Sequence, residues 1–130
     1  MKSPDGSNVK TILVVEDESV ITSVCQRVLT NEGFEVNIAT NGKVAQSMIE
    51  KNHYALCLID IRTPEINGME LFQWLKDRHS EIANRVIFTT GDVMGGEVTG
   101  FIEQSGMPFL PKPFTPDELK AIVKISLKQV

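Results

Sequence analysis

The chain has 130 residues, with 42% apolar and 23% charged residues, which is ordinary for one globular domain. Its formal net charge of −4, without any basic cluster, argues against a domain that binds nucleic acid directly. No apolar run approaches the roughly 18 residues that a membrane-spanning helix needs, and the N-terminus has no signal-peptide core. These observations favour a cytoplasmic domain that does not cross a membrane.

In chain order, a polar segment containing Pro and Gly predicts a flexible leader over residues 1–9 and one folded domain over residues 10–130. Within that domain, five apolar runs predict strands, and apolar residues at helical spacing predict a helix after each. The strands are expected at residues 10–15, 35–39, 54–60, 85–89 and 109–110. The apolar faces of the helices are expected at residues 20–29, 44–49, 69–75, 94–102 and 119–123.

Capping residues mark several of these helices. Ser19 is expected to cap the first, and Gly33 ends it where a left-handed C-cap is favoured. Thr115 and Glu118 have the spacing of a capping box before the last helix. The fourth helix contains several glycines, which lower helix stability, so we expect it to be the least stable element.

The alternation of strands and helices predicts an α/β fold with a parallel sheet covered on both faces. Right-handed crossovers make a doubly wound sandwich the expected arrangement, with strand order 2-1-3-4-5 as one of two common choices. The sequence pattern favours this order without proving it.

Chemistry-bearing residues follow four of the predicted strands. Asp60 ends the third strand, where by itself it would suit a turn or a helix cap. Glu16 and Asp17 follow the first strand, Thr90 the fourth and Lys112 the fifth. Because the carboxyl ends of parallel strands share one edge of a sheet, we expect these residues to lie close together.

Three crowded carboxylates need a cation to stay ionised, and Mg²⁺ suits such oxygen ligands. With the metal bound, Asp60 could attack phosphorus to form an aspartyl phosphate. Mg²⁺ and the Lys112 ammonium would then neutralise the phosphoryl oxygens, while Thr90 offers a hydroxyl donor to the attached group.

This set of residues resembles the receiver domain of two-component response regulators over about residues 10–127, which implies a flavodoxin-like (βα)5 sandwich. The resemblance is carried by Glu16-Asp17, by Asp60 with Pro64 and Gly68, by Thr90-Gly91 and by Lys112-Pro113.

The resemblance implies a role for each matched residue. Asp60 would be the phosphoacceptor, with Asp17 a direct magnesium ligand and Glu16 a ligand through water. Arg62 would offer its backbone carbonyl to the metal. Lys112, with a cis bond to Pro113, would bind the phosphate. Thr90 would be the switch hydroxyl and Phe109 the switch aromatic residue, which turns inward on activation.

The sequence departs from the family pattern at a few positions around the site. Thr63 replaces the usual Met, and Gly91 replaces the commoner Ala, which would leave the phosphoryl group more open. Arg62 and Asp92 flank the site and could pair across its mouth, impeding the hydrolytic water.

The resemblance also implies partners and a route for the signal. The phosphoryl donor would be a histidine kinase or a phosphotransfer protein. Inward movement of Phe109 would repack the fourth helix and the fifth strand. The face formed by the fourth helix, fifth strand and last helix would bind a downstream effector or output domain, and a homodimer is left open.

Two alternatives belong to other classes. Asp60-Ile61-Arg62-Thr63 partly matches the Asp-x-Asp-x-Thr signature of haloacid-dehalogenase phosphatases, but Arg62 occupies the place of the second Asp. A degenerate receiver used only for binding is the other alternative, although Asp60, Thr90 and Lys112 are intact. On the receiver reading the chain is not an enzyme beyond its own phosphorylation and dephosphorylation.

The cysteines and histidines are expected to be structural. Cys25 and Cys57 lie in apolar patterns without Cys-x-x-Cys spacing, which predicts buried free thiols. His53 and His79 show no metal-ligand spacing.

Overall fold

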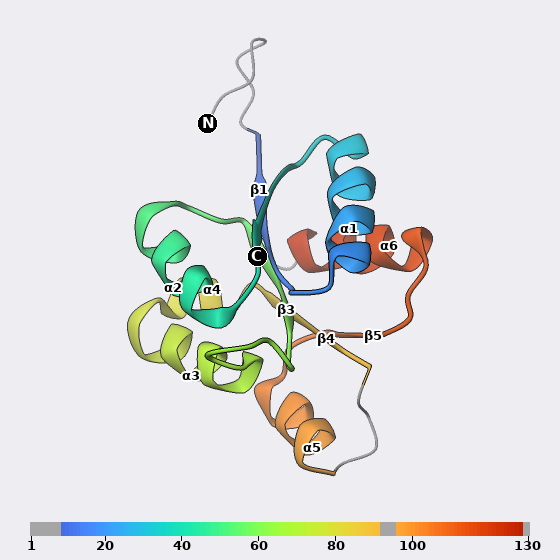
Figure 1. Cartoon of the computed structure of the whole chain (residues 1–130). Coiled ribbons are helices and arrows are strands. Elements are labelled where there is room, and N and C mark those ends of the chain that lie inside the picture. Colours follow the sequence, from blue (N-terminus) through green and yellow to red (C-terminus); the bar gives the residue numbers. More distant parts are fainter. Residues whose placement is uncertain (1–8, 92–95, 129–130) are drawn as a thin grey trace.

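The computed structural model describes residues 9–91 and 96–128. Five short strands form the sheet at the centre of the molecule (Figure 1). They are β1 (Thr11–Val15), β2 (Glu35–Ala39), β3 (Leu56–Asp60), β4 (Val86–Thr90) and β5 (Phe109–Pro111). All neighbouring strands are parallel and follow the order β2-β1-β3-β4-β5. The predicted α/β fold and strand order are therefore confirmed.

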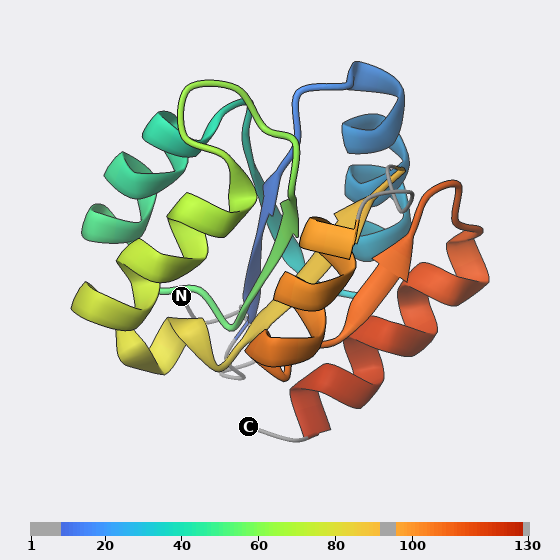
Figure 2. The same cartoon turned by 90° about the horizontal axis from the view of Figure 1, so that it is seen from below.

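Helices cover both faces of the sheet, as Figure 2 shows. They are α1 (Ser19–Asn31), α2 (Gly42–Lys51), α3 (Gly68–Arg78), α4 (Ser80–Ala83), α5 (Gly96–Ser105) and α6 (Pro116–Lys128). One apolar core lies between the sheet and α2, α3 and α5, and a second lies between the sheet and α1 and α6. Burial of both faces explains why β3 and β4 are apolar without alternation.

The ends of two helices follow the sequence prediction. Gly33 has φ of +94°, and the amide of Phe34 donates to the carbonyl of Leu29, which closes α1 in a Schellman motif. At the start of α6, the Thr115 amide donates to Glu118 and the Glu118 amide donates to the Thr115 hydroxyl. These reciprocal bonds form the predicted capping box.

Other local predictions were wrong. Ser19 is the first residue of α1 and does not cap it, because the N-cap position is Glu18, which makes no side-chain capping bond. The short helix α4 was not predicted, since four residues are too few to show a helical period. Tyr54 precedes β3, whereas Thr90 belongs to β4, because the ladder continues to the pair Thr90 and Pro111.

Several expectations fall on parts of the chain that are not described. Residues 1–8 of the predicted leader lie outside the described residues, as do Met94 and Gly95 of the predicted fourth helix. In the described ranges, no helix has the length and apolarity to span a membrane.

Candidate functional site

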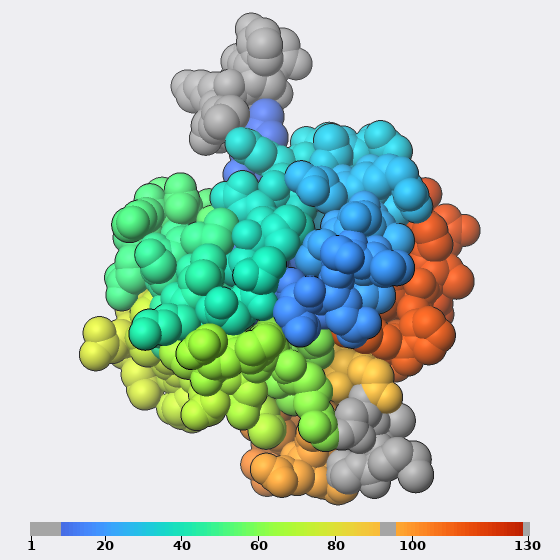
Figure 3. Space-filling view, in the orientation of Figure 1, coloured from blue at the N-terminus to red at the C-terminus, as the bar shows by residue number. Residues whose placement is uncertain are grey.

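Three carboxylates meet at the carboxyl ends of β1 and β3. One carboxylate oxygen from each of Glu16, Asp17 and Asp60 lies within 4.8 Å of the others. Glu16 is only 1% exposed and Asp60 only 3%, whereas Asp17 is exposed. The segments that follow β1 (blue) and β3 (light green) lie side by side on the surface in Figure 3. The structure thus brings together the acidic residues singled out from the sequence.

Backbone hydrogen bonds fix the two buried carboxylates. The Glu16 amide donates to the carbonyl of Ala39, which extends the β1–β2 ladder by one bond. The Glu18 amide in turn donates to Glu16 Oε2 at 3.1 Å. On β3, Asp60 Oδ1 accepts the Arg62 amide at 3.1 Å, so Asp60 also makes the turn that its position suggested.

Lys112 joins these carboxylates from beyond β5. Its Nζ lies 2.7 Å from Glu16 Oε1, 3.0 Å from Glu18 Oε1 and 3.0 Å from Asp60 Oδ2. The Lys112 side chain is 11% exposed. One largely buried ammonium therefore contacts three carboxylates. The peptide bond between Lys112 and Pro113 is cis.

Burial and pairing act against each other at this cluster. Burial of the Lys112 ammonium lowers its pKa, but its close contacts with the carboxylates of Glu16, Glu18 and Asp60 outweigh burial, so the pKa is raised. For Glu16, burial is the largest influence and the nearby Asp60 charge adds to it, so its pKa is raised despite the ion pair with Lys112.

Glu18 is the contact that the sequence reading missed. Its carboxylate reaches Lys112 as closely as Asp60 does. The available signal was the run of three acids after β1. Which of those acids turns back toward β5 depends on the path of the β1–α1 loop, which sequence pattern does not define.

The loop from Asp60 to α3 is held at several points. Asn67 and Glu70 form a capping box at the start of α3, and the Thr63 hydroxyl donates to the Ile66 carbonyl at 3.0 Å. Gly68 packs tightly, because a Cβ at this position would lie 2.7 Å from Ile61 Cα and 2.8 Å from the Asp60 carbonyl oxygen.

The same loop is also fastened to α2. The Gly42 amide donates to the Pro64 carbonyl at 3.2 Å. A Cβ at Gly42 would collide with the Ile66 carbonyl. The start of α2 thus fits directly against the loop that follows Asp60.

The remaining predicted residues lie around the cluster. Thr90 is fully buried at the end of β4, and its carbonyl accepts the Lys112 amide at 3.0 Å. Gly91 follows it, beside the Lys112 side chain. Arg62 is exposed, Phe109 is partly buried on β5, and Asp92 lies outside the described residues, so a pair between Arg62 and Asp92 stays a prediction.

The donor set fits a magnesium ion. Glu16, Asp17 and Asp60 offer hard oxygen ligands close together, and Glu18 brings a fourth carboxylate to the same edge. A single Lys112 ammonium leaves these acids with an excess of negative charge, which a divalent cation can compensate.

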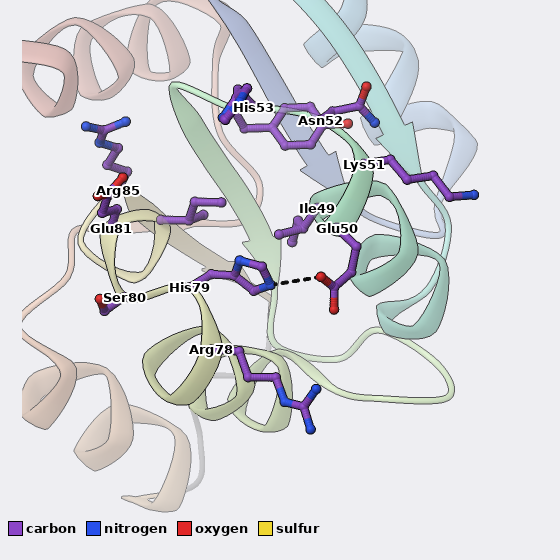
Figure 4. Close-up of a pocket in the computed structure, with 12 residues that line it drawn as sticks. Ile49, Glu50, Lys51, Asn52, His53, Arg78, His79, Ser80, Glu81 and Arg85 are labelled. Atoms are coloured by element: carbon purple, nitrogen blue, oxygen red, sulfur yellow. Dashed lines mark ion pairs between the residues drawn. The ribbon is translucent and has the colours of Figure 1, made fainter.

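A separate cavity of about 460 Å³ lies at the opposite, amino-terminal edge of the sheet. Figure 4 shows His79 pointing toward Glu50, and their Nε2 and Oε2 atoms lie 3.4 Å apart. The His79 ring also packs against Trp74, with centroids 4.9 Å apart. Arg78 and Lys51 point away from this pair in Figure 4, so the charges around the cavity do not converge on one point.

The two cysteines match their predicted state. Cys25 and Cys57 are both buried and free.

Comparisons with known proteins agree with this geometry. A family model described as "Response regulator receiver domain" matches residues 12–124. The chain is 32% identical over 115 residues to the transcriptional regulatory protein CrdR of Helicobacter pylori, covering 88% of this chain and 54% of CrdR. It is 31% identical over 118 residues to SrrA of Staphylococcus aureus, covering 91% of this chain and 48% of SrrA. The chain therefore spans about half the length of these curated relatives.

Solved structures give the same match. A CheY-like receiver domain protein from Methanospirillum hungatei superposes with a TM-score of 0.85 at 28% identity, covering 94% of this chain and 96% of that one. The receiver domain of the sensor histidine kinase PA1611 from Pseudomonas aeruginosa superposes with a TM-score of 0.81 at 26% identity, covering 93% and 99%. That structure is described as having a magnesium ion coordinated in its active-site cleft.

Proposed function

The chain belongs to the response regulator receiver domain family, and from that premise we propose that Asp60 is its phosphoacceptor. A receiver domain is a phosphoacceptor of two-component signalling and not an enzyme with a separate substrate. The haloacid-dehalogenase alternative is set aside by the family match. The proposal concerns which residues of this chain carry the phosphoryl group and respond to it.

The contact between Lys112 and Asp60 is the observation that supports this proposal most directly. Lys112 Nζ lies 3.0 Å from Asp60 Oδ2, inside a pocket where both side chains are largely buried. A carboxylate oxygen of Asp60 attacks phosphorus as the bond from phosphorus to the donor's histidine nitrogen breaks. The new P–O bond leaves the acyl phosphate on Asp60, and Lys112 is close enough to balance its negative oxygens.

We propose that Glu16, Asp17 and Asp60 hold Mg²⁺, with the backbone carbonyl of Arg62 as a further ligand. Bound there, the ion supplies positive charge that offsets the phosphoryl oxygens during transfer. The protein's own part is to keep Glu16 and Asp60 buried and fixed by backbone hydrogen bonds. The magnesium ion of the Pseudomonas receiver domain supports the same choice of metal.

Thr90 and Phe109 would change position in response to the attached phosphoryl group. Thr90 ends β4 next to Gly91, where its hydroxyl can turn toward a new acceptor. Phe109 is only partly buried and lines a cavity with Ile102 and Met107, which leaves space for the ring to move. The exposed face of α5, β5 and α6 is then the surface that a partner would recognise.

Partners and location are proposed on the same basis. The phosphoryl donor would be a histidine kinase or a phosphotransfer protein, since receiver domains pair with histidine kinases. The effector would be a downstream protein or an output domain, since CrdR and SrrA are transcriptional regulators about twice as long as the part that the chain matches. A cytoplasmic location is proposed together with the family assignment.

Phosphotransfer to defined variants tests the proposal. We expect acetyl phosphate or a panel of histidine kinases to label the wild type with one phosphoryl group, with Mg²⁺ present, and peptide mapping to place it on Asp60. Asp60→Asn should not be labelled, whereas Asp77→Asn, which changes an exposed acid on α3, should behave as the wild type. Absence of any label would support a binding-only module, and label on another residue would overturn the assignment of Asp60.

A further inference from the structure

Thr89 has a buried hydroxyl that the proposed mechanism does not use. It is the fourth residue of β4 and is 1% exposed. Its Oγ1 has no hydrogen-bond partner in the described part of the structure. Leaving a buried hydroxyl without a partner costs free energy, so its place in the fold calls for an explanation.

The register of the sheet puts Thr89 beside Asp60. The two residues are directly paired across the β3–β4 ladder. Paired residues in a parallel ladder point to the same face of the sheet, and side chains alternate along each strand. Leu58 and Ile87, two residues earlier on each strand, belong to the core beneath α1 and α6. Thr89 and Asp60 therefore both continue that face, while Thr90 falls on the other.

The path of Lys112 leads past Thr89. On its other side, Thr89 is paired with Leu110, and Lys112 is two residues further along on the same face. Lys112 contacts Asp60 on β3 although β4 lies between them. A Cβ at Gly91 would lie 3.8 Å from Lys112 Cβ, which places the lysine stem next to β4. Thr89 on β4 thus lies between Asp60 on β3 and Lys112, which follows β5.

The present hydrogen bonds leave the Thr89 hydroxyl out. Asp60 Oδ1 accepts from the Arg62 amide, and Asp60 Oδ2 accepts from Lys112. A phosphoryl group on Asp60 would add three strong acceptor oxygens and draw Lys112 toward them. An oxygen of the Asp60 group would then be free to accept from a rotatable hydroxyl on the same sheet face.

We infer that Thr89 is a positioning residue of the phosphoacceptor site, whose hydroxyl donates to phosphorylated Asp60 once Lys112 has turned to the phosphoryl group. The inference rests on the proposed function and adds a second threonine to it. Thr90 would respond from one face of the sheet, and Thr89 would orient the acyl phosphate from the other.

The test compares Thr89→Val, which keeps the side-chain shape, with Ser126→Ala. Ser126 is a matched control, because its Oγ is also buried without a hydrogen-bond partner but lies near the amino-terminal ends of the strands. For each protein, the melting temperature is measured with Mg²⁺ and with or without beryllofluoride, and the half-life of the aspartyl phosphate is measured separately.

We expect Thr89→Val to melt at or above the wild-type temperature without beryllofluoride, because an unpaired hydroxyl is removed. Beryllofluoride should raise the melting temperature of Thr89→Val by less than it raises that of the wild type. The half-life of the aspartyl phosphate should change roughly threefold or more, which corresponds to the loss of one hydrogen bond. Thr89→Ser, which keeps the hydroxyl, should restore both, and Ser126→Ala should show the wild-type increase.

A purely structural role predicts another result. If Thr89→Val shows the wild-type rise in melting temperature and the wild-type phosphoryl half-life while Asp60 is still labelled, this inference fails and the proposed function stands. If Asp60 is not labelled in the wild type, the proposed function itself fails. Should Thr89→Val not fold, the comparison of Thr89→Ser with Thr89→Ala decides, because only Ala loses the hydroxyl.

Discussion

The ammonium of Lys112 lies closer to Glu16, at 2.7 Å, than to Asp60, at 3.0 Å. Lys112 is therefore held as much by the acid that follows β1 as by the proposed phosphoacceptor. This sharing predicts that Lys112 stabilises the fold independently of any phosphoryl group, because Glu16 and Asp60 are buried and would otherwise lack a cation.

Lys112→Met should lower the free energy of unfolding in magnesium-free buffer by up to about 3–5 kcal/mol, since it leaves buried carboxylates without their partner. Added Mg²⁺ should recover part of the loss. Lys124→Met is the matched control, because Lys124 pairs with Glu32 at the same 3.0 Å on the surface and should cost less than about 1 kcal/mol. Equal losses in the two variants, measured by urea denaturation, would contradict the role given to Lys112.

Glu16 should make stability depend on pH. Burial raises its pKa above the ordinary value of 4.5. A carboxyl group with a raised pKa stabilises the fold most below pH 4.5, and this contribution is lost as the pH rises through its folded pKa. The difference in free energy of unfolding between wild type and Glu16→Gln should therefore decrease above pH 4.5 and then level off, in urea titrations with EDTA.

Glu32 provides a control of opposite sign. Hydrogen bonding to Lys124 lowers its pKa. Its contribution is therefore present above pH 4.5 and is lost as the pH falls through its folded pKa. The difference in free energy of unfolding between wild type and Glu32→Gln should decrease as the pH falls below 4.5. The same direction of change for Glu16→Gln and Glu32→Gln would show that burial does not dominate at Glu16.

Two glycines near the site should respond differently to an added methyl group. A Cβ at Gly68 would come within 2.8 Å of backbone atoms of Asp60 and Ile61, so Gly68→Ala should cost about 1–3 kcal/mol and slow labelling of Asp60. A Cβ at Gly91 would make an ordinary contact of 3.8 Å with Lys112, so Gly91→Ala should fold as the wild type.

The Gly91→Ala variant should also lose its phosphoryl group more slowly, because the methyl group narrows access to the site. Urea denaturation and the half-life of the aspartyl phosphate check both glycines. Normal stability of Gly68→Ala, or a shorter half-life for Gly91→Ala, would contradict this account.

The two thiols should be inert in the folded protein. Burial raises the pKa of Cys25 and of Cys57 to about 12, and neither side chain is exposed. Since the thiolate is the reactive form, a chromogenic disulfide reagent at pH 8 should modify neither in native protein and both in urea. Rapid reaction of one thiol without urea would show that its helix or strand opens locally.

Much of the fold could be predicted from sequence because its signals are local and repeated. The apolar runs of β1 and β3 and the capping pair Thr115 and Glu118 act within a few residues of themselves. Parallel topology then determines that Asp60 and Lys112 meet, since both follow carboxyl ends of strands in one sheet. The same reasoning does not reach single-residue boundaries, as Ser19 and Thr90 show.

The parts of the site that could not be predicted depend on register and loop path. Glu18 turns back to Lys112 only because of the conformation between β1 and α1. Thr89 is the last residue of the apolar run that predicts the fourth strand. Its position opposite Asp60 follows from the β3–β4 register, which the sequence pattern does not determine. Neither residue carried a motif of its own.

The fit of Gly42 against Ile66 and Pro64 has a consequence for sequence variation. Position 42 supplies no atom to the cluster of acids, yet any larger residue there would displace the segment between Asp60 and α3. Variation at the first residue of α2 should therefore be restricted by chemistry that takes place at the end of β3, and a library randomised at position 42 should return glycine when selected for signalling.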